Sequence, residues 1–435
     1  MSSIEKTLAH IQALGRKFEG LLEAARAKGH GVAEKPAHGT ALRERGAFGS
    51  NPGNLRMFVH VPERLPRLAP LVVALHGCGQ TAADYDRGTG WSALADRLGF
   101  AVVFPEQQPA NNPKNCFSWF LPGDIARDQG EALSIRQMVE HAITTFGVDR
   151  RKVFVTGLSA GGAMAAVMLA TYPEVFAGGA IIAGLPYGSA RSVQEAFEAM
   201  FTERSASARS LGDRVRLASG QQGPWPKISV WHGTADPIVK PSNAEGIVRQ
   251  WTDVHGLPAA PSYVESIGDH TRRVWDDGNG DPVVEAFSIS GMGHGVPLAV
   301  TMGEEAFGVP GPFFLDAGIC STRHIAGFWG LGEGVVAPSH AAALAPRPYQ
   351  VPDRAHAAAA GAAGAGTGPA AASINLDARH DARGSLDPGR VIAEALKAAG
   401  LPAPALSTGQ PVRRRVAAAN SIIEAALTAA GLKRA

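Results

Sequence analysis

The sequence predicts an α/β fold built on a mostly parallel sheet with helices on both faces. Apolar, β-branched runs alternate along the chain with helical patterns, as they do in such sheets. One run, Lys152–Thr156, leads into Gly157-Leu158-Ser159-Ala160-Gly161 and then into a helix pattern of small residues. A strand, a Gly-x-Ser-x-Gly turn and a helix in this order are typical of the α/β-hydrolase fold.

Length and composition limit the classes of protein that the chain can represent. Its 435 residues, of which 45% are hydrophobic and 18% charged, suffice for one large α/β domain with additional segments. A net charge of +2 argues against nucleic acid as the main partner and gives no case for an acidic substrate. No apolar run approaches the ~20 residues that a membrane-spanning helix needs.

Three cysteines (Cys78, Cys116 and Cys320) are too few for a disulfide scaffold. One disulfide plus one free thiol fits this number, but we expect three thiols in a reducing compartment. The N-terminus agrees, because Glu5 comes early and neither a continuous apolar stretch nor an Ala-x-Ala-like cleavage site is present. The chain therefore gives no direct sign of export, and a cytoplasmic location stays open.

Residues 1–53 are predicted to form an amphipathic helix and a connector. The helix runs from Ser3 to about Ala27, and Ser2-x-x-Glu5 fits a capping box. Its apolar positions are Ile4, Leu8, Ile11, Leu14, Phe18, Leu21 and Ala25. We expect this helix to dock on its own domain or on a second subunit, the alternative being contact with a polymer or membrane surface. The segment Gly29–Asn54, rich in Gly, Ala and charge, is the connector.

An α/β-hydrolase domain is predicted over residues 54–354, with its strand and helix patterns between Asn54 and Leu331. The predicted strands are Arg56–Val61, Leu71–Leu75, Ala101–Phe104, Lys152–Thr156, Gly179–Ile182, Lys227–Trp231 and Val283–Ile289. The predicted helices are Trp91–Leu98, Gln129–Phe146, Ala160–Thr171 and Asn243–Val254. The polar, helical segment Ser189–Gly223 is expected to be an insertion near the mouth of a site at the carboxyl ends of the strands.

Beyond this domain the composition changes. Residues 355–372 are nearly all Ala and Gly with one Pro, which predicts a flexible linker. Residues 373–435 are predicted to form a short basic helical tail, because Val391–Leu401 resembles Ile422–Leu432 and each pattern contains a C-cap glycine. Seven Lys and Arg outnumber two Glu over residues 390–435. An appended helical module or a disordered segment is expected here, with contact to an anionic or granule surface as the alternative.

Ser159 is predicted to be the nucleophile of an acyl transfer reaction. The tight turn strains the serine backbone, and side chains at Gly157 or Gly161 would collide with the neighbouring strand and helix. The helix that follows directs its N-terminal amides at the serine, where negative charge develops. The structural alternative is a glycine-rich turn with a buried serine.

Asp236 and His294 are predicted to complete a catalytic triad with Ser159. In the α/β-hydrolase order the acid follows the serine and the histidine follows the acid. Asp236 lies just past one predicted strand, and His294 lies among glycines just past another. The alternatives are an Asx-turn before Pro237 for the aspartate and a structural hydrogen bond for the histidine.

Two backbone amides are expected to form the oxyanion hole. One belongs to Ala160, directly after the nucleophile, and the other to Cys78 in the loop of Leu75–Gln80. A cysteine hydrolase is not expected, because no strand, elbow and helix pattern surrounds Cys78.

Other polar candidates receive structural interpretations. His76 and His232 also sit at strand ends, but in the wrong chain order for a base. The run Asp276–Asp281 lacks the twelfth-position glutamate of a calcium-binding EF-hand loop, which favours a glycine turn between strands. His294 and His324 have no nearby ligand cluster to suggest zinc. The predicted chemistry requires no metal and no cofactor.

Four motifs together resemble the polyhydroxybutyrate depolymerase family of esterases, which is related to feruloyl and acetylxylan esterases. They are Leu75–Gln80, Cys116–Phe120, Gly157–Gly162 and Trp231–Asp236, and the resemblance covers about Asn54 to Leu331. It implies a serine esterase without cofactor that acts on short hydroxyalkanoate or carbohydrate-linked esters. It implies the same roles for the predicted nucleophile, acid and base.

The resemblance also implies positions around the substrate. Cys78 falls at the oxyanion-loop cysteine, and Trp119 falls at an aromatic position near the substrate cleft, with core packing as the alternative for Trp119. A disulfide between Cys78 and Cys116 is left open. The family is typically exported. After the linker the chain shows no fibronectin-like strand array that could bind polymer, so soluble oligomers or small esters are alternative substrates.

The function predicted first is therefore a serine carboxylesterase acting on poly(3-hydroxybutyrate) or on short hydroxyalkanoate oligomers. A feruloyl or acetylxylan esterase with the same triad is the second prediction. A non-catalytic protein that binds a granule or surface, through the N-terminal helix or the basic tail, is the third. The sequence does not predict an oligomeric state.

Overall fold

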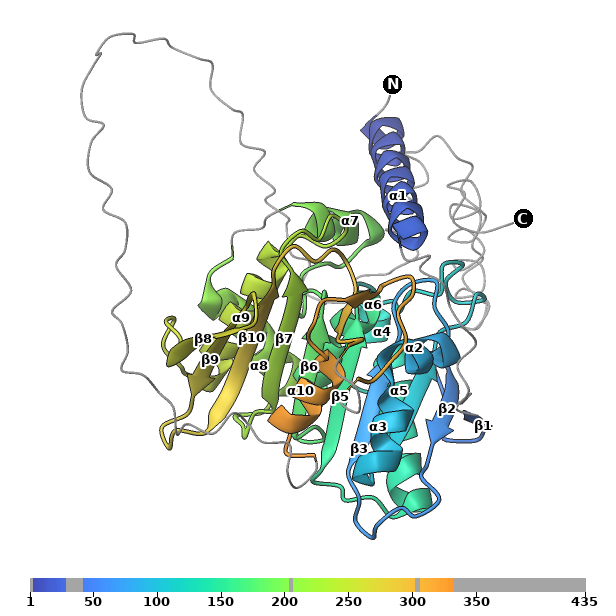
Figure 1. Cartoon of the computed structure of the whole chain (residues 1–435). Coiled ribbons are helices and arrows are strands. Elements are labelled where there is room, and N and C mark those ends of the chain that lie inside the picture. Colours follow the sequence, from blue (N-terminus) through green and yellow to red (C-terminus); the bar gives the residue numbers. More distant parts are fainter. Residues whose placement is uncertain (1–2, 29–41, 203–205, 302–305, 332–435) are drawn as a thin grey trace, which may run out of the picture. The chain divides into compact units, whose positions relative to one another are not determined.

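The computed structural model describes residues 3–28, 42–202, 206–301 and 306–331 (Figure 1). Ser2 of the predicted capping box lies outside these residues, as do the predicted linker, the two similar helical segments and the basic tail. Within the described ranges, no helix combines the length and apolar character that crossing a bilayer requires.

A ten-stranded sheet lies at the centre of the described chain, in the order β1-β2-β4-β3-β5-β6-β7-β10-β9-β8 (Figure 1). The strands are β1 (Arg43–Arg45), β2 (Arg56–His60), β3 (Leu71–Leu75), β4 (Ala101–Glu106), β5 (Val153–Leu158), β6 (Gly178–Ile182), β7 (Lys227–Gly233), β8 (Tyr263–Ile267), β9 (His270–Asp276) and β10 (Pro282–Ile289). The central strands from β4 to β10 pair in parallel, and the outer strands pair antiparallel. The predicted mostly parallel sheet is confirmed.

All seven predicted strands form, with small shifts at their ends. Every residue of β3, β4, β5 and β6 is buried. Because successive side chains of a strand point to opposite faces, this pattern requires cover on both faces of the sheet. The edge strands were not predicted, since β1 holds only Arg-Glu-Arg and β8 alternates between half-buried and exposed residues.

The helices are α1 (Ser3–Lys28), α2 (Ala82–Thr89), α3 (Trp91–Leu98), α4 (Pro122–Ile125), α5 (Gly130–Phe146), α6 (Ala160–Thr171), α7 (Val193–Phe201), α8 (Ala208–Ser219), α9 (Ser242–His255) and α10 (Ser321–Phe328). The four helices predicted in the main domain correspond to α3, α5, α6 and α9. The predicted insertion forms α7 and α8 between β6 and β7. A two-stranded pair, β11 (Val296–Leu298) with β12 (Phe314–Asp316), follows the central sheet.

Helix α1 packs on its own domain, which was the first of its predicted placements. The ring of Phe18 lies edge-on to Phe197 of α7 with centroids 5.8 Å apart. The ammonium of Lys17 lies 4.6 Å from the ring centroid of Phe201. Phe18 and Leu22 are the buried apolar residues on this helix among those whose side chains are described.

Candidate active site

Ser159 occupies the sharp turn between β5 and α6. Its backbone has φ 58° and ψ −117°, a conformation that L-residues adopt only under strain. Its amide donates a hydrogen bond of 2.9 Å to the carbonyl of Ile182 at the end of β6. A Cβ at Gly157 would overlap the carbonyl oxygen of Gly161, and a Cβ at Gly161 would overlap that of Leu75. Only glycine fits at either position, as the sequence predicted.

Asp236 and His294 meet as a buried pair. Nδ1 of His294 lies 2.7 Å from Oδ2 of Asp236, and both residues are nearly inaccessible. The other carboxylate oxygen accepts hydrogen bonds from the amides of Ile238, at 2.8 Å, and Val239, at 3.0 Å. The Asx-turn considered for Asp236 is thus also present, because one oxygen shapes the turn while the other holds the imidazole.

His232 is a site residue that the sequence interpretation missed. Its Nε2 lies 3.2 Å from Oδ2 of Asp236 and 2.9 Å from the carbonyl oxygen of Val239. The imidazole of His232 therefore contacts the same carboxylate oxygen of Asp236 that His294 contacts, besides its place in the His-Gly turn. Its position at the end of β7, four residues before Asp236, was the available signal.

The electrostatics of the pair keep Asp236 ionised. Burial alone would raise the pKa of its carboxyl, but attraction by His294 and hydrogen bonds from His232 and His294 outweigh burial. The pKa of Asp236 therefore lies well below its usual range. An aspartate that stays charged can orient an imidazole and stabilise its protonated form.

The loop that carries Cys78 is fixed at its base by a buried imidazole. Nδ1 of His76 donates to the carbonyl oxygen of Gly77 at 2.8 Å, and Nε2 accepts a hydrogen bond of 3.0 Å from the amide of Gln107. Burial lowers the pKa of His76 to about 4, so the ring is neutral at neutral pH. This agrees with its structural interpretation.

Three further bonds hold the same loop. The side chain of Gln80 accepts from the amide of Gly77 at 2.8 Å, and the amide of Gly79 donates to the carbonyl of Lys114 at 2.7 Å. Cys78 and Cys116 form a disulfide, with the sulfurs 2.11 Å apart. The expectation of three free thiols is wrong, because the loops after β3 and β4 bring these two cysteines together. Cys320 is a buried free thiol.

The two predicted oxyanion donors lie beside the nucleophile. Ala160 begins α6, where first-turn amides have no partner inside the helix. Cys78 lines the same small cavity as Ser159. Among the described residues neither amide is hydrogen-bonded to another group, so both can donate to a developing oxyanion.

Ser159 and His294 meet at a small cavity at the carboxyl ends of the strands. Its space of about 10 Å³ holds roughly one water molecule. The lining residues are Leu22, Gly77, Cys78, Gln80, Leu158, Ser159, His294 and Phe313. Within the described part of the chain, no hydrogen bond joins the serine hydroxyl to the imidazole, and such bonds often tighten only when substrate binds. The presence of Leu22 shows that α1 covers part of this site.

Trp119 does not reach this cavity. Its side chain is 6% exposed and packs edge-on against Phe120, with the ring centroids 5.3 Å apart. Neighbouring Ser118 donates its amide to the buried carboxyl of Glu131 at 2.8 Å. This environment favours core packing, the alternative interpretation of Trp119, and a role at the substrate stays a prediction.

The remaining candidates have structural surroundings. The run Asp276–Asp281 forms the turn between β9 and β10, in which a carboxylate oxygen of Asp277 accepts from the amides of Asn279, at 2.8 Å, and Asp281, at 3.0 Å. In the part of the chain that the structure describes, no three His, Cys, Asp or Glu side chains form a group able to hold a metal ion.

Comparisons with known proteins agree with this geometry. Residues 57–272 match the family described as esterase PHB depolymerase. The chain is 48% identical to poly(3-hydroxyalkanoate) depolymerase C of Paucimonas lemoignei over 67% of this chain and 70% of that protein. It is 36% identical to an acetylxylan esterase of Coprinopsis cinerea over 60% of this chain and 70% of that protein. The structure of an acetyl xylan esterase from Aspergillus awamori, 28% identical, superposes with a TM-score of 0.55 and covers 58% of this chain and 94% of that one.

Proposed function

The chain belongs to the polyhydroxybutyrate depolymerase family of esterases, and we propose that it hydrolyses hydroxyalkanoate esters through an acyl-enzyme on Ser159. It has the α/β-hydrolase fold and is a carboxylic-ester hydrolase. The observation that carries the proposed mechanism is the 2.7 Å bond between His294 and Asp236 beside the cavity of Ser159. That bond gives the imidazole the orientation a general base needs.

The proposed reaction has two steps. His294 takes the proton of Ser159 as the hydroxyl oxygen attacks the ester carbonyl, and then gives that proton to the departing alcohol. Asp236 keeps the ring oriented and stabilises its charge, while the amides of Cys78 and Ala160 hold the oxyanion. Water then attacks the acyl-enzyme with the same imidazole as base, and the acid leaves.

The proposed substrate is poly(3-hydroxybutyrate) or a soluble oligomer of a short hydroxyalkanoate. The relative that is 48% identical is named a poly(3-hydroxyalkanoate) depolymerase, which supports this choice. Acetylxylan or feruloyl esters are the second candidate, supported by relatives of both names at 36% and 32% identity.

A panel of ester substrates tests the proposal. Polyhydroxybutyrate film, 3-hydroxybutyrate oligomers, methyl ferulate and acetylated xylan are each incubated with the wild-type chain and with Ser159→Ala. We expect wild-type hydrolysis of the film or the oligomers and none above background by the variant. Activity confined to ferulate or to acetylated xylan would replace the proposed substrate. Binding of film without any hydrolysis would support the third prediction, a surface-binding protein.

A further inference from the structure

The ring of Phe313 lies beside His294, and we propose that it determines which alcohol groups the enzyme accepts, by packing against the alcohol part of the bound ester. This inference rests on the proposed function and names the part of the substrate that one residue selects. In a hydroxyalkanoate chain, that part is the hydroxy-acid unit on the alcohol side of the ester bond.

Phe313 borders the same small cavity as Ser159 and His294. Its ring lies edge-on to the imidazole of His294, with the ring centroids 6.1 Å apart and the ring planes at 82°. The residue is buried, with 4% of its surface exposed. A group bound at Ser159 therefore meets an apolar surface on the histidine side of the nucleophile.

The backbone of Phe313 has a conformation that bulky residues rarely adopt. Its φ is 69°, in the left-handed region that favours glycine. It is the third residue of the turn Gly311–Phe314, directly after Pro312, and the amide of Phe314 donates to the carbonyl of Gly311 at 2.9 Å. A turn with proline second and a positive φ third is of type II, in which glycine is usual at the third position. A phenylalanine at this position costs stability, and residues held under such strain cluster at functional sites.

Backbone contacts hold this turn against the segment that carries His294. The carbonyl of Phe313 accepts a hydrogen bond of 2.8 Å from the amide of Val296, at the start of β11. A Cβ at Gly295 would lie 2.7 Å from the same carbonyl oxygen, so the two backbones are closer than a side chain would allow. Contacts within two residues of His294 thus fix the ring of Phe313 relative to the imidazole.

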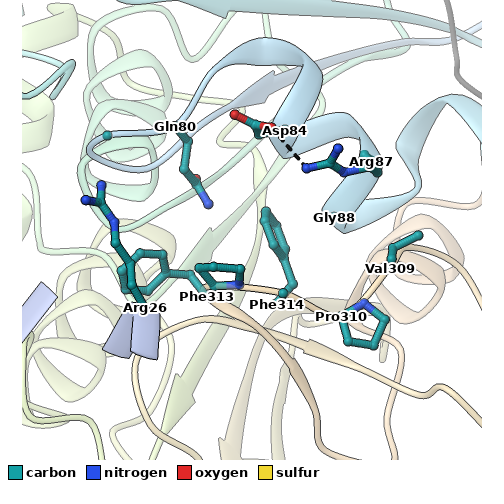
Figure 2. Close-up of a pocket in the computed structure, with 12 residues that line it drawn as sticks. Arg26, Gln80, Asp84, Arg87, Gly88, Val309, Pro310, Phe313 and Phe314 are labelled. Carbon is teal, nitrogen blue, oxygen red and sulfur yellow. Dashed lines mark hydrogen bonds and ion pairs between the residues drawn. The ribbon is translucent and has the colours of Figure 1, made fainter. Parts of the chain in front are cut away.

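The neighbouring Phe314 offers a comparison within the same turn. Figure 2 shows the two rings leaving the backbone in different directions, with that of Phe314 pointing toward α2. A Cβ at Gly88 of this helix would lie 2.3 Å from the ring of Phe314, and the ring centroid is 6.1 Å from that of Tyr85. Of the two phenylalanines, only Phe313 is among the described residues that border the cavity at Ser159. Phe314 therefore packs the core, while Phe313 faces the reacting groups.

The chemistry at His294 assigns the ring to the alcohol side of the ester. The proposed reaction places the carbonyl oxygen of the ester at the amides of Cys78 and Ala160. The imidazole gives its proton to the departing alcohol, so the alcohol oxygen lies next to His294. The carbon atoms attached to that oxygen therefore lie at the ring of Phe313. A phenyl ring has no polar atom, and its contact removes methyl and methylene groups from water.

Two pairs of alkyl esters test the inference. The alcohol ratio is kcat/KM for butyl butyrate divided by that for methyl butyrate, and the acyl ratio is kcat/KM for methyl hexanoate divided by that for methyl butyrate. Comparing each ratio between proteins cancels the intrinsic reactivity of the esters.

The variants are Phe313→Gly, which removes the ring and suits the positive φ, Phe313→Leu, and the matched control Phe314→Leu. A fully buried methylene favours binding by about fourfold, so we expect the alcohol ratio to fall by about tenfold in Phe313→Gly and by less in Phe313→Leu. The acyl ratio in both variants, and both ratios in Phe314→Leu, should stay at the wild-type values. The melting temperature of each variant shows whether it is folded.

The outcomes separate this inference from the proposed function. An unchanged alcohol ratio in Phe313→Gly, or in Phe313→Leu if the glycine variant does not fold, would overturn the role of the ring and leave the esterase assignment intact. A higher alcohol ratio would also overturn it, because the ring would then be a barrier and not a contact surface. The same holds for an equal fall of the acyl ratio, or for the same fall in Phe314→Leu. Absence of hydrolysis of all three esters by the wild-type chain would overturn the proposed function and this inference together.

Discussion

The two sides of Ser159 are built in different ways. On the sheet side, every residue of β5 and of α6 is buried, and two glycines let the backbones of the elbow touch. On the α1 side, the described anchors are Phe18, Leu22 and exposed polar contacts such as the 2.7 Å ion pair of Glu19 with Lys114. Exposed ion pairs of this kind contribute about 0–1 kcal/mol. The comparison indicates that the tightly packed β5 and α6 hold the reacting groups in place. Access of substrate to Ser159, and the choice among substrates, depend on the more loosely packed α1.

The largest effect is expected for a change in the buried pair on the sheet side. Asp236→Asn keeps the shape and the turn but presents an amide to His294, which favours the wrong tautomer of the imidazole. By comparison with other triads, kcat should fall by about 10⁴-fold at neutral pH. His232→Gln removes only the second partner of Asp236, so kcat should fall by about tenfold. A loss of this size is typical when the residue that orients a directly acting group is replaced. Hydrolysis of 4-nitrophenyl butyrate and the melting temperature of each variant are measured together. An Asp236→Asn enzyme within tenfold of the wild type would contradict the triad.

A smaller effect on the same side concerns stability and pH. Burial lowers the pKa of His76 to about 4, below the value of about 6.5 for an unfolded chain. Between these values the unfolded state binds more protons than the folded state, so stability is full above about pH 6.5 and falls as pH decreases toward 4. The complete loss corresponds to about 3 kcal/mol. Denaturant unfolding between pH 7.5 and 4.5 should show a steeper decline for the wild type than for His76→Asn, which is expected to be less stable at pH 7.5. Parallel curves for the two proteins would contradict this account of the loop.

The smallest effect is expected on the α1 side. Leu22→Ala enlarges the cavity at Ser159 and leaves the triad unchanged. We therefore expect kcat/KM for a small ester to increase by only a few-fold. The main thermal transition should stay where it is, because a helix with few buried contacts can loosen independently of the sheet. Leu217→Ala is the control, since Leu217 on α8 is 84% exposed. Loss of activity in Leu22→Ala, or a large drop in melting temperature, would show that α1 belongs to the rigid part.

The sequence predicted the sheet side well, and the reason is its regular burial. Strands β3, β5 and β7 are almost fully buried and rich in apolar residues, and Ser159 and Asp236 were found from their positions just past β5 and β7. The outer strands β8 and β9 were missed because β8 alternates between half-buried and exposed residues and because charged residues interrupt both patterns. His232 was assigned to a turn because its place in the chain order does not fit a base. Its spacing of four residues before Asp236 does not by itself reveal that the two side chains meet.

The α1 side could be predicted only in part. Helical spacing predicted the helix and its apolar face, but spacing does not determine which surface of the domain that face covers. The positions of Leu22 beside Ser159 and of Arg26 beside Gly79 therefore emerge only from the fold. The disulfide of Cys78 and Cys116 is a similar case, because it depends on the approach of two loops that lie 38 residues apart.

The most direct test of the central claim is whether an acyl group forms on Ser159. The wild-type chain is mixed with a 4-nitrophenyl ester, quenched in acid within the first turnover and examined by intact-mass measurement and peptide mapping. We predict a burst of 4-nitrophenol and an acyl mass increment on the peptide that contains Ser159, with neither in Ser159→Ala. An increment on another residue, or full activity in the variant, would contradict the proposed chemistry.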